Sequence, residues 1–249
     1  MALTELRYWS NALGRQTSAM AILPQGRPGP FPVWYLLHGL SDDHTAWTRW
    51  TGLDRYLAGL PLIVVMPDGG RGWYTNARTP PPARYESAII EDLLPWVDAT
   101  FRTLASRDGR VVSGLSMGGY GAVKLALKHP HLFRAAASHS GALGRGAASI
   151  KGDDAWNAEM RAVFGPRPQG GPDDLFALAS RFRGKPAPAL RIDCGRKDFL
   201  IRDNRAFHRH LAKLKVPHTY VERDGAHTWD YWDREVQTLI PWFRALLGI

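Results

Sequence analysis

The chain has 249 residues, of which 45% are hydrophobic and 22% charged, and these values exclude a disordered, collagen-like or coiled-coil protein. The formal charge of +9 would suit a nucleic-acid partner or an anionic substrate, but no block of five or more basic residues occurs, so we expect no nucleic-acid binding. The single cysteine, Cys194, excludes an internal disulfide and a cysteine-based zinc site. We interpret it as a small buried apolar residue.

The amino-terminal segment, residues 1–10, has no basic stretch followed by an apolar core and therefore does not resemble a signal peptide. The longest apolar run, residues 60–66, is far too short to span a bilayer. We therefore expect a cytoplasmic protein without a membrane span.

Short apolar runs alternate along the chain with longer segments of helical spacing, and this alternation predicts an α/β fold with a mostly parallel sheet flanked by helices. Two strands, 7–10 and 18–23, come first and are expected to be antiparallel at one edge. Further strands are predicted at 33–37, 62–66, 110–114, 133–138, 190–194 and 218–222. Helices are predicted at 85–101, where Pro95 should kink or split the helix, and at 117–128, 201–214 and 232–247.

Residues 144–184 fit this alternation least, because they are rich in Gly, Pro and Asp and carry only short helical pieces around 154–164 and 174–181. We expect a small cap-like insert over the carboxyl edge of the sheet, within a single domain of residues 1–249. The basic stretch 202–215 is interpreted as the solvated face of an amphipathic helix.

The segment Gly114 to Gly118 has the pattern G-x-S-x-G of a nucleophile elbow. In such an elbow the serine lies on a strained turn between a strand and a helix, and the glycines let the two backbones approach closely. The pattern alone is weak evidence, since a Gly-rich turn can carry an incidental serine. Here the predicted strand 110–114 and helix 117–128 flank it as the elbow requires, so Ser116 is the predicted nucleophile.

A serine nucleophile needs a base, which is normally a histidine that a carboxylate orients. In a chain with this elbow the order is serine, acid, histidine. Seven histidines follow Ser116, and of these His227 lies in the loop between the last predicted strand and the final helix. His227 is therefore the predicted general base.

The acid is expected on the loop that follows the strand 190–194. Asp198 lies in that loop and is our prediction. Asp193 is the alternative, although it lies within the strand. Asp224 is close to His227 in sequence but is interpreted as a turn residue with Gly225.

The oxyanion hole requires two backbone N–H donors. We predict that one comes from Met117, directly after the nucleophile, and the other from Leu40, in the loop after the strand 33–37. Gly39 gives this loop its conformational freedom. His38 either supports the loop as a polar group or is simply packed within it.

These residues together resemble the esterase D family of α/β-hydrolases. The segments that carry the resemblance are LHGLSDD at 37–43, VMPDGG at 65–70, GLSMGGYGA at 114–122, and DCG and DFL within 193–200. The family includes tributyrin-type carboxylesterases, S-formylglutathione hydrolases, feruloyl and acetylxylan esterases, and mycolyltransferases. Segments 116–121 and 138–143 are most similar to the tributyrin-esterase branch. The resemblance implies a serine carboxylesterase that hydrolyses short-chain acyl esters through an acyl-enzyme, without a cofactor or a metal.

The resemblance also implies that Trp73 and Tyr74 belong to a loop at the mouth of the acyl site and bind substrate. The alternative is an aromatic loop packed on the core. His139 stands where the family pattern suggests an apolar residue, which leaves its role open.

Three other functions remain open at this point. A thioesterase of the S-formylglutathione hydrolase type and an acyltransferase would use the same three catalytic residues. A catalytically silent binding protein could share the fold, because a fold does not imply a function. The expected partner is a small acyl ester, and the sequence does not fix the oligomeric state.

Overall fold

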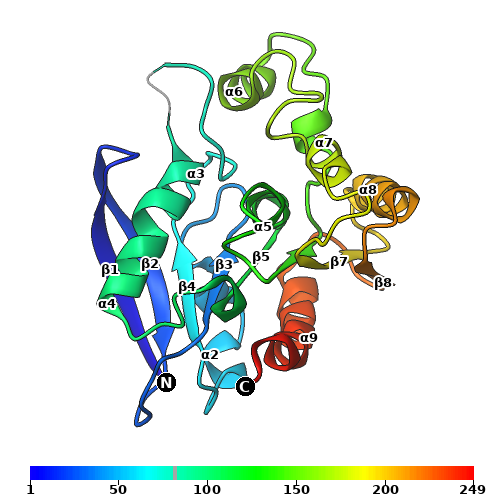
Figure 1. Ribbon diagram of the computed structural model, residues 1–249. Coiled ribbons are helices and arrows are strands. Elements are labelled where there is room, and N and C mark those ends of the chain that lie inside the picture. Colours follow the sequence, from blue (N-terminus) through cyan, green and yellow to red (C-terminus); the bar gives the residue numbers. More distant parts are fainter. Residues whose placement is uncertain (81–82) are drawn as a thin grey trace.

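The computed structural model describes residues 1–80 and 83–249 and contains one eight-stranded sheet, in the order β1-β2-β4-β3-β5-β6-β7-β8 (Figure 1). The strands are β1 Ala2–Ser10, β2 Arg15–Leu23, β3 Val33–Leu37, β4 Ile63–Pro67, β5 Arg110–Leu115, β6 Ala135–His139, β7 Ala189–Gly195 and β8 His218–Arg223. β1 pairs antiparallel with β2, and β2 pairs antiparallel with β4. All pairings from β4 to β8 are parallel. The predicted α/β fold is confirmed, and its antiparallel strands lie at one edge.

Helices cover both faces of the sheet. They are α1 Ala46–Trp50, α2 Leu53–Tyr56, α3 Tyr85–Ser87, η1 Ala88–Leu93, α4 Leu94–Thr100, η2 Arg107–Gly109, α5 Met117–Lys128, η3 Arg145–Ala147, α6 Ala155–Phe164, α7 Leu175–Ser180, α8 Ile201–Leu214 and α9 Trp229–Leu247. One buried apolar cluster lies between the sheet and α4, α5 and α8, and a second lies between the sheet and α1, α2 and α9. Every residue of β3, β4 and β5 is buried, since these central strands have helices on both sides.

The predicted split at Pro95 has a specific form. The segment 85–101 is divided into α3, the π-helix η1 and α4, and Pro95 lies in the first turn of α4. Proline has no N–H to donate, and its ring clashes with the carbonyl one turn earlier. A wider π turn just before the proline accommodates both effects. The helical segment thus continues through Pro95 with a π turn in place of an ordinary α-helical turn.

The insert, residues 144–184, contains η3, α6 and α7, close to the short helices expected from the sequence. Asp154 caps α6 by accepting a hydrogen bond from the N–H of Asn157, and Asp174 caps α7 in the same way through Phe176. α7 packs against α5 and α8, whereas α6 lies farther out, at the top of Figure 1.

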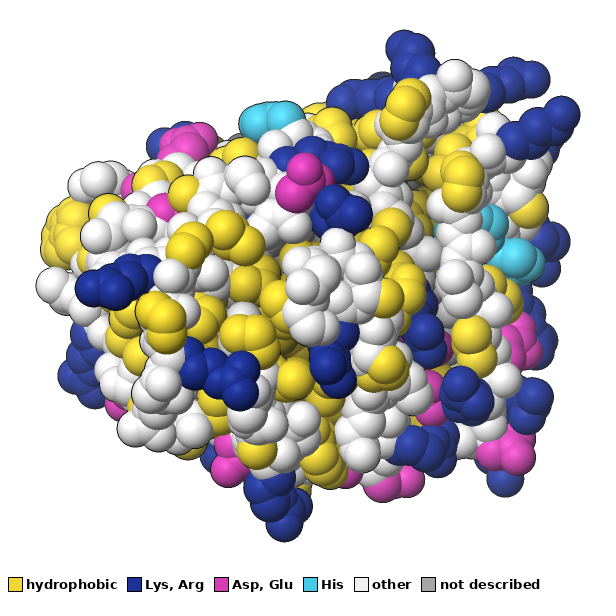
Figure 2. All heavy atoms as spheres, turned by 60° about the horizontal axis from the view of Figure 1, so that its bottom comes forward, with side chains coloured by type: hydrophobic (Ala, Val, Ile, Leu, Met, Phe, Trp, Pro, Cys, Tyr) yellow, Lys and Arg dark blue, Asp and Glu magenta, His cyan; other side chains and the backbone are white. Residues whose placement is uncertain are grey.

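The positive charge is spread over the surface. On the face drawn in Figure 2, Lys and Arg side chains lie scattered among apolar and acidic groups. In α8, the side chains of Asn204, Phe207 and Leu211 point inward, whereas Arg202, Arg205 and Arg209 are exposed, as expected of an amphipathic helix. Within the described ranges, no helix has the length and apolar character needed to cross a bilayer.

Candidate active site

Ser116 lies between β5 and α5 with a backbone φ of 52° and ψ of −114°, a strained conformation for a residue with a side chain. The neighbouring glycines permit this turn. A Cβ atom on Gly118 would lie 2.4 Å from the carbonyl oxygen of Leu37, and one on Gly114 would lie 2.6 Å from the backbone of Gly118. The sequence therefore forms a sharp elbow in which the serine side chain stands clear of the sheet.

The structure brings Ser116, His227 and Asp198 together in one line of hydrogen bonds. The Nε2 atom of His227 is 3.0 Å from the Oγ atom of Ser116, and its Nδ1 atom is 2.8 Å from Oδ2 of Asp198. An ionised carboxylate can only accept a hydrogen bond, so Nδ1 is the atom that donates its proton. The lone pair of Nε2 then faces the serine hydroxyl, which is the arrangement that a general base requires.

The environment of Asp198 keeps its carboxylate charged. Burial on its own would raise the pKa of Asp198, but hydrogen bonds from His227 and from the backbone N–H of Leu200, at 2.8 Å, outweigh it and lower the pKa. The buried negative charge can thus stabilise a positive charge on His227 during the reaction.

The two alternative acids have other partners. Asp193 bonds the Nδ1 atom of His139 at 2.7 Å and accepts from the hydroxyl of Tyr231 at 3.1 Å, and all three residues are fully buried. Asp224 pairs at the surface with Arg196 at 2.6 Å. The geometry therefore favours Asp198 as the partner of His227, and it reveals a fully buried histidine–carboxylate pair that the sequence did not predict.

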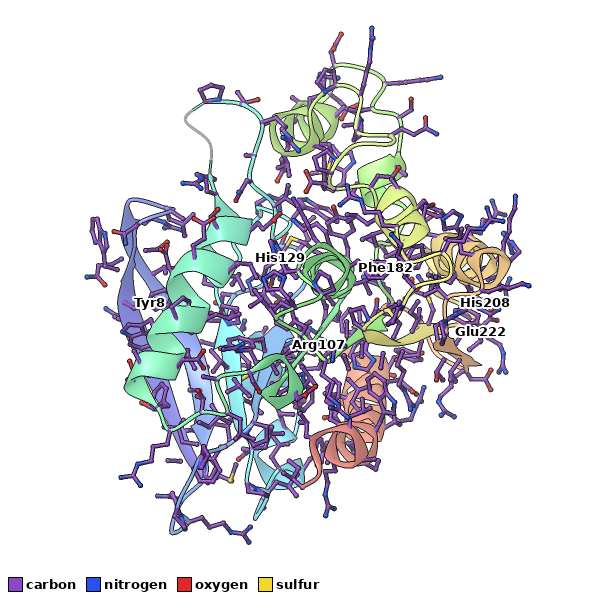
Figure 3. The ribbon with its side chains drawn as sticks, viewed as in Figure 1. Tyr8, Arg107, His129, Phe182, His208 and Glu222 are labelled. Carbon is purple, nitrogen blue, oxygen red and sulfur yellow. The ribbon has the colours of Figure 1, made fainter. Side chains whose placement is uncertain are left out.

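Other histidines contact partners away from Ser116. Figure 3 shows His129 beside α5, where its Nε2 atom is 2.9 Å from Oε1 of Glu86. His208 lies on α8 near Glu222 in the same view, and its ring stacks on that of Tyr220.

A cavity of about 380 Å³ opens beside Ser116. Its lining consists of Gly39, Leu40, Asp42, Leu115, Ser116, His227, Thr228, Trp229 and Trp232. Leu40, one of the two predicted oxyanion donors, is in this lining. Met117 is the first residue of α5, so its N–H has no acceptor within the helix and lies at the positive end of the helix dipole.

His38 supports the loop that carries Leu40. Its Nε2 atom accepts a hydrogen bond from the N–H of Gly69 at 2.8 Å, and its Nδ1 atom is 2.7 Å from the carbonyl oxygen of Gly39. With Nε2 as acceptor, Nδ1 is the donor to Gly39. The imidazole thus joins the end of β3 to the loop after β4.

Trp73 and Tyr74 do not reach the cavity lining. Trp73 is 3% exposed and packs on the rings of Tyr120 and Phe164, and Tyr74 is fully buried with its hydroxyl bonded to the carbonyl oxygen of His38. The Nζ atom of Lys124 donates to the carbonyl oxygen of Tyr74 at 2.6 Å and holds the loop inward. The structure therefore favours the packed aromatic loop over the expected place at the mouth of the site.

The sequence did not predict that four further residues line the cavity, namely Asp42, Thr228, Trp229 and Trp232. The helix after His227 begins at Trp229, three residues earlier than expected, which puts Trp229 and Trp232 on one face at the site. Two tryptophans three residues apart, shortly after the predicted base His227, were the available signal.

Comparisons with known proteins identify the family of this chain. The family model described as "Putative esterase" matches residues 10–243. An esterase of Mycobacterium tuberculosis is 34% identical over 89% of this chain, and the chain spans about half of that relative, 54% of its length. An acetyl esterase of Caldicellulosiruptor saccharolyticus is 25% identical, over 97% of this chain and 98% of the relative. The crystal structure of an S-formylglutathione hydrolase from Staphylococcus aureus superposes with a TM-score of 0.85 at 29% identity, over 97% of this chain and 98% of that one. This chain belongs to the esterase family of α/β-hydrolases, as the resemblance predicted.

Proposed function

We propose that this protein is a serine esterase that hydrolyses short-chain acyl esters. The observation that carries the proposal is the line from Ser116 through His227 to Asp198, at 3.0 and 2.8 Å, beside a cavity open to a substrate. Membership of the esterase family supports the same activity.

In the first half of the reaction, Nε2 of His227 takes the hydroxyl proton while Oγ of Ser116 attacks the ester carbonyl. The N–H groups of Leu40 and Met117 hold the negative oxygen that forms. His227 then gives the proton to the leaving alcohol, and the acyl group stays on Ser116.

In the second half, water takes the place of the alcohol. His227 removes a proton from this water, which attacks the acyl carbon of the acyl-enzyme. His227 then returns the proton to Oγ of Ser116 as the acid is released. Asp198 keeps Nδ1 protonated throughout and stabilises the imidazolium. This cycle needs only the residues described above.

The cavity volume supports a short acyl group. About 380 Å³ must hold the reacting ester together with part of its alcohol, and it lies at the low end of the range of small-molecule pockets. The similarity to an acetyl esterase agrees with this size.

A thioesterase is the second candidate, because one similar structure is an S-formylglutathione hydrolase. The cavity offers little to an anionic thiol carrier, since its charged lining residue is the carboxylate of Asp42. Competition between S-formylglutathione and a neutral ester would separate the two activities.

Two further expectations belong to this proposal: the insert limits the acyl group as a cap, and the protein works in the cytoplasm. For the first, Arg71 binds Glu159 of α6 through two hydrogen bonds of 2.7 Å and also donates to Ser41, next to Leu40. A Glu159→Gln variant should therefore broaden the acyl-length profile. Cell fractionation of the native host tests the location.

The decisive experiment is hydrolysis of p-nitrophenyl esters from acetate to palmitate by the wild type and by Ser116→Ala. We expect a maximum at short chains and a fall in kcat of several orders of magnitude in the variant. A wild type that is inert on every ester and thioester would overturn the proposal.

A further inference from the structure

Aromatic rings in pairwise contact adjoin the imidazole of His227. The ring of Phe199 lies 4.5 Å from it on one side, and the ring of Trp232 lies 4.8 Å from it on another. Trp229 packs edge-on against Trp232 at 5.2 Å, and Trp50 stacks on Trp229 at 6.3 Å. We call Phe199, Trp232, Trp229 and Trp50 the aromatic wall.

Two members of the wall are exposed in a way that core packing does not explain. Phe199 is 74% exposed and Trp50 is 55% exposed, and few large apolar side chains in the described ranges are as open. Phe199 directly follows the buried Asp198, and its ring reaches the surface beside the ring of His227. The other two members, Trp229 and Trp232, line the cavity beside Ser116, so the exposed rings continue an apolar surface that begins in the cavity. Exposed apolar groups of this kind mark a binding surface.

The position of the wall relative to the proton path indicates which part of a substrate meets it. His227 delivers its proton to the oxygen of the departing alcohol, so the alcohol must lie against the imidazole. The oxyanion donors, Leu40 and Met117, bind the carbonyl oxygen and therefore lie on the other side of the reacting carbon. Two members of the wall, Phe199 and Trp232, are direct neighbours of the His227 ring, and Trp229 and Trp50 extend the wall outward from Trp232.

We propose that the aromatic wall binds the alcohol part of the substrate and that this alcohol is an uncharged, flat group such as an aromatic ring. Ring faces of this kind bind planar apolar groups by stacking and edge contacts. The carboxylate of Asp42 in the same lining disfavours an anionic alcohol. The inference rests on the proposed esterase function and adds the class of leaving group.

The test varies the alcohol and keeps the acyl group constant. Phenyl acetate and 2-naphthyl acetate release alcohols of similar acidity, but naphthyl offers one more ring to the wall. The kcat/KM ratio of naphthyl to phenyl ester would be measured for the wild type, Phe199→Ala and Trp50→Ala. Trp9→Ala is the matched control, because Trp9 is 56% exposed and lies on β1, at the far edge of the sheet.

We expect each wall variant to lower this ratio by about three- to tenfold, the order of one aromatic contact, and Trp9→Ala to leave it unchanged. An active enzyme whose ratio is the same in all variants would overturn the inference while leaving the esterase function intact. A change in preference between phenyl acetate and phenyl butyrate, without a change in the naphthyl ratio, would assign the wall to the acyl group and would also overturn it. A wild type that is inert on all of these esters would instead refute the proposed function.

Discussion

The imidazole of His227 gives each of its ring nitrogens a separate task, and the carboxylate of Asp198 maintains that division. With Nδ1 bonded to Asp198 at 2.8 Å, Nε2 is free to accept the proton of Ser116. In Asp198→Asn the amide can donate to Nδ1 and favour the wrong tautomer. We expect kcat for p-nitrophenyl acetate to fall by about 10⁴-fold with little change in folding.

Asp224→Asn is the control for this variant, because Asp224 is also close to His227 in sequence but pairs with Arg196 at the surface. It should retain wild-type kcat. A fall in kcat of less than tenfold in Asp198→Asn would contradict the assignment of Asp198 as the acid and would favour the alternative, Asp193.

A second residue-scale prediction concerns the charge of Asp42. Burial raises the pKa of Asp42, although His38 and Arg49 oppose the effect. The carboxylate should repel an anionic leaving group while it is ionised. The probe is phenyl acetate with a sulfonate group on the ring opposite the ester oxygen. The quantity to measure is the ratio of kcat/KM for this sulfonated ester to kcat/KM for plain phenyl acetate. We expect Asp42→Asn to raise this ratio above the wild-type value by about three- to tenfold, the order of one screened charge pair.

The pH dependence of this preference gives an internal check. The sulfonate stays charged, and a raised pKa means that Asp42 becomes neutral at a higher pH than an exposed aspartate. In the wild type the preference for the neutral ester should therefore weaken as the pH falls towards that pKa. In Asp42→Asn it should not vary with pH. A preference that varies equally in both proteins would contradict the role of Asp42.

At the scale of the elements, the buried carboxylate of Asp193 joins three segments that lie beside the proposed catalytic residues. On β6, His139 bonds Asp193 through its ring and accepts the N–H of Ser116 through its backbone at 3.0 Å. On β7, Asp193 itself lies five residues before Asp198. On α9, Tyr231 donates to Asp193 and lies four residues after His227. Burial of Tyr231 and the nearby carboxylates of Asp193 and Glu235 raise the pKa of its phenol. The hydroxyl group therefore keeps its proton and remains a hydrogen-bond donor.

Tyr231→Phe removes this hydroxyl and keeps the ring. We expect kcat to fall about tenfold with KM unchanged, because small displacements of a catalytic group carry costs of this order. Thr238→Val is the matched control: Thr238 also links α9 to β7, through Arg191 at 3.0 Å, but it lies farther along the helix from His227. Similar losses of stability in both variants, with a loss of kcat in Tyr231→Phe alone, would identify a positioning role. Equal kcat values would contradict it.

The sequence was sufficient for the elements whose signal is local. Continuous apolar runs predicted the buried strands β3 and β4, and Pro95 predicted the division of the segment 85–101. The elbow was predictable because G-x-S-x-G fell between a strand and a helix. The start of α9 was three residues off, since no capping side chain marks it: Thr228 makes no side-chain cap bond.

The missed features depend on partners distant in sequence. Trp73 and Tyr74 turn inward because Lys124, 50 residues after Tyr74, bonds the carbonyl oxygen of Tyr74. Asp193 turns to His139, 54 residues away, rather than to His227. No periodicity or motif encodes such pairs, so a single sequence could not reveal them.

At the scale of the whole molecule, a buried ionic network joins the loop 73–75, α3, α5 and the insert. Lys124 is fully buried and bonds Glu86 at 2.8 Å and Thr75 at 2.9 Å. Lys128, one turn further along α5, bonds Glu86 at 2.9 Å and Asp173 of the insert at 3.3 Å. Burial lowers the pKa of Lys124, and the carboxylates of Glu86 and Asp173 oppose that effect. Removing one partner from such a network leaves a buried charge without compensation.

Acid should weaken this network through Glu86. Burial alone would raise the pKa of Glu86, but His129, Lys124 and Lys128 outweigh it and bring the pKa far below its ordinary value of 4.5. A carboxylate with a depressed folded-state pKa contributes stability that is fully present above its unfolded pKa and is lost as the pH falls through the folded one. The contribution of Glu86 to the melting temperature should therefore be nearly constant from pH 7 to pH 5. At pH values under about 4.5 the melting temperature should decrease.

The variant Lys128→Met separates this charge effect from packing. It should lower the free energy of unfolding by about 1–3 kcal/mol at neutral pH, the usual cost of a lost hydrogen bond to a charged group. Since both proteins share one unfolded-state pKa, the difference from the wild type should stay constant while Glu86 is ionised in both folded proteins. It should shrink only as the pH falls through the folded-state pKa of Glu86 in the variant, which is the higher of the two folded-state values. Arg161→Met, which removes an exposed pair with Asp153, is the control and should show no such dependence. A Lys128→Met difference that stays constant over the whole pH range in which Glu86 titrates in the folded proteins would mean that Lys128 stabilises the fold by contacts of its aliphatic chain. The bond to Glu86 would then not contribute to acid sensitivity.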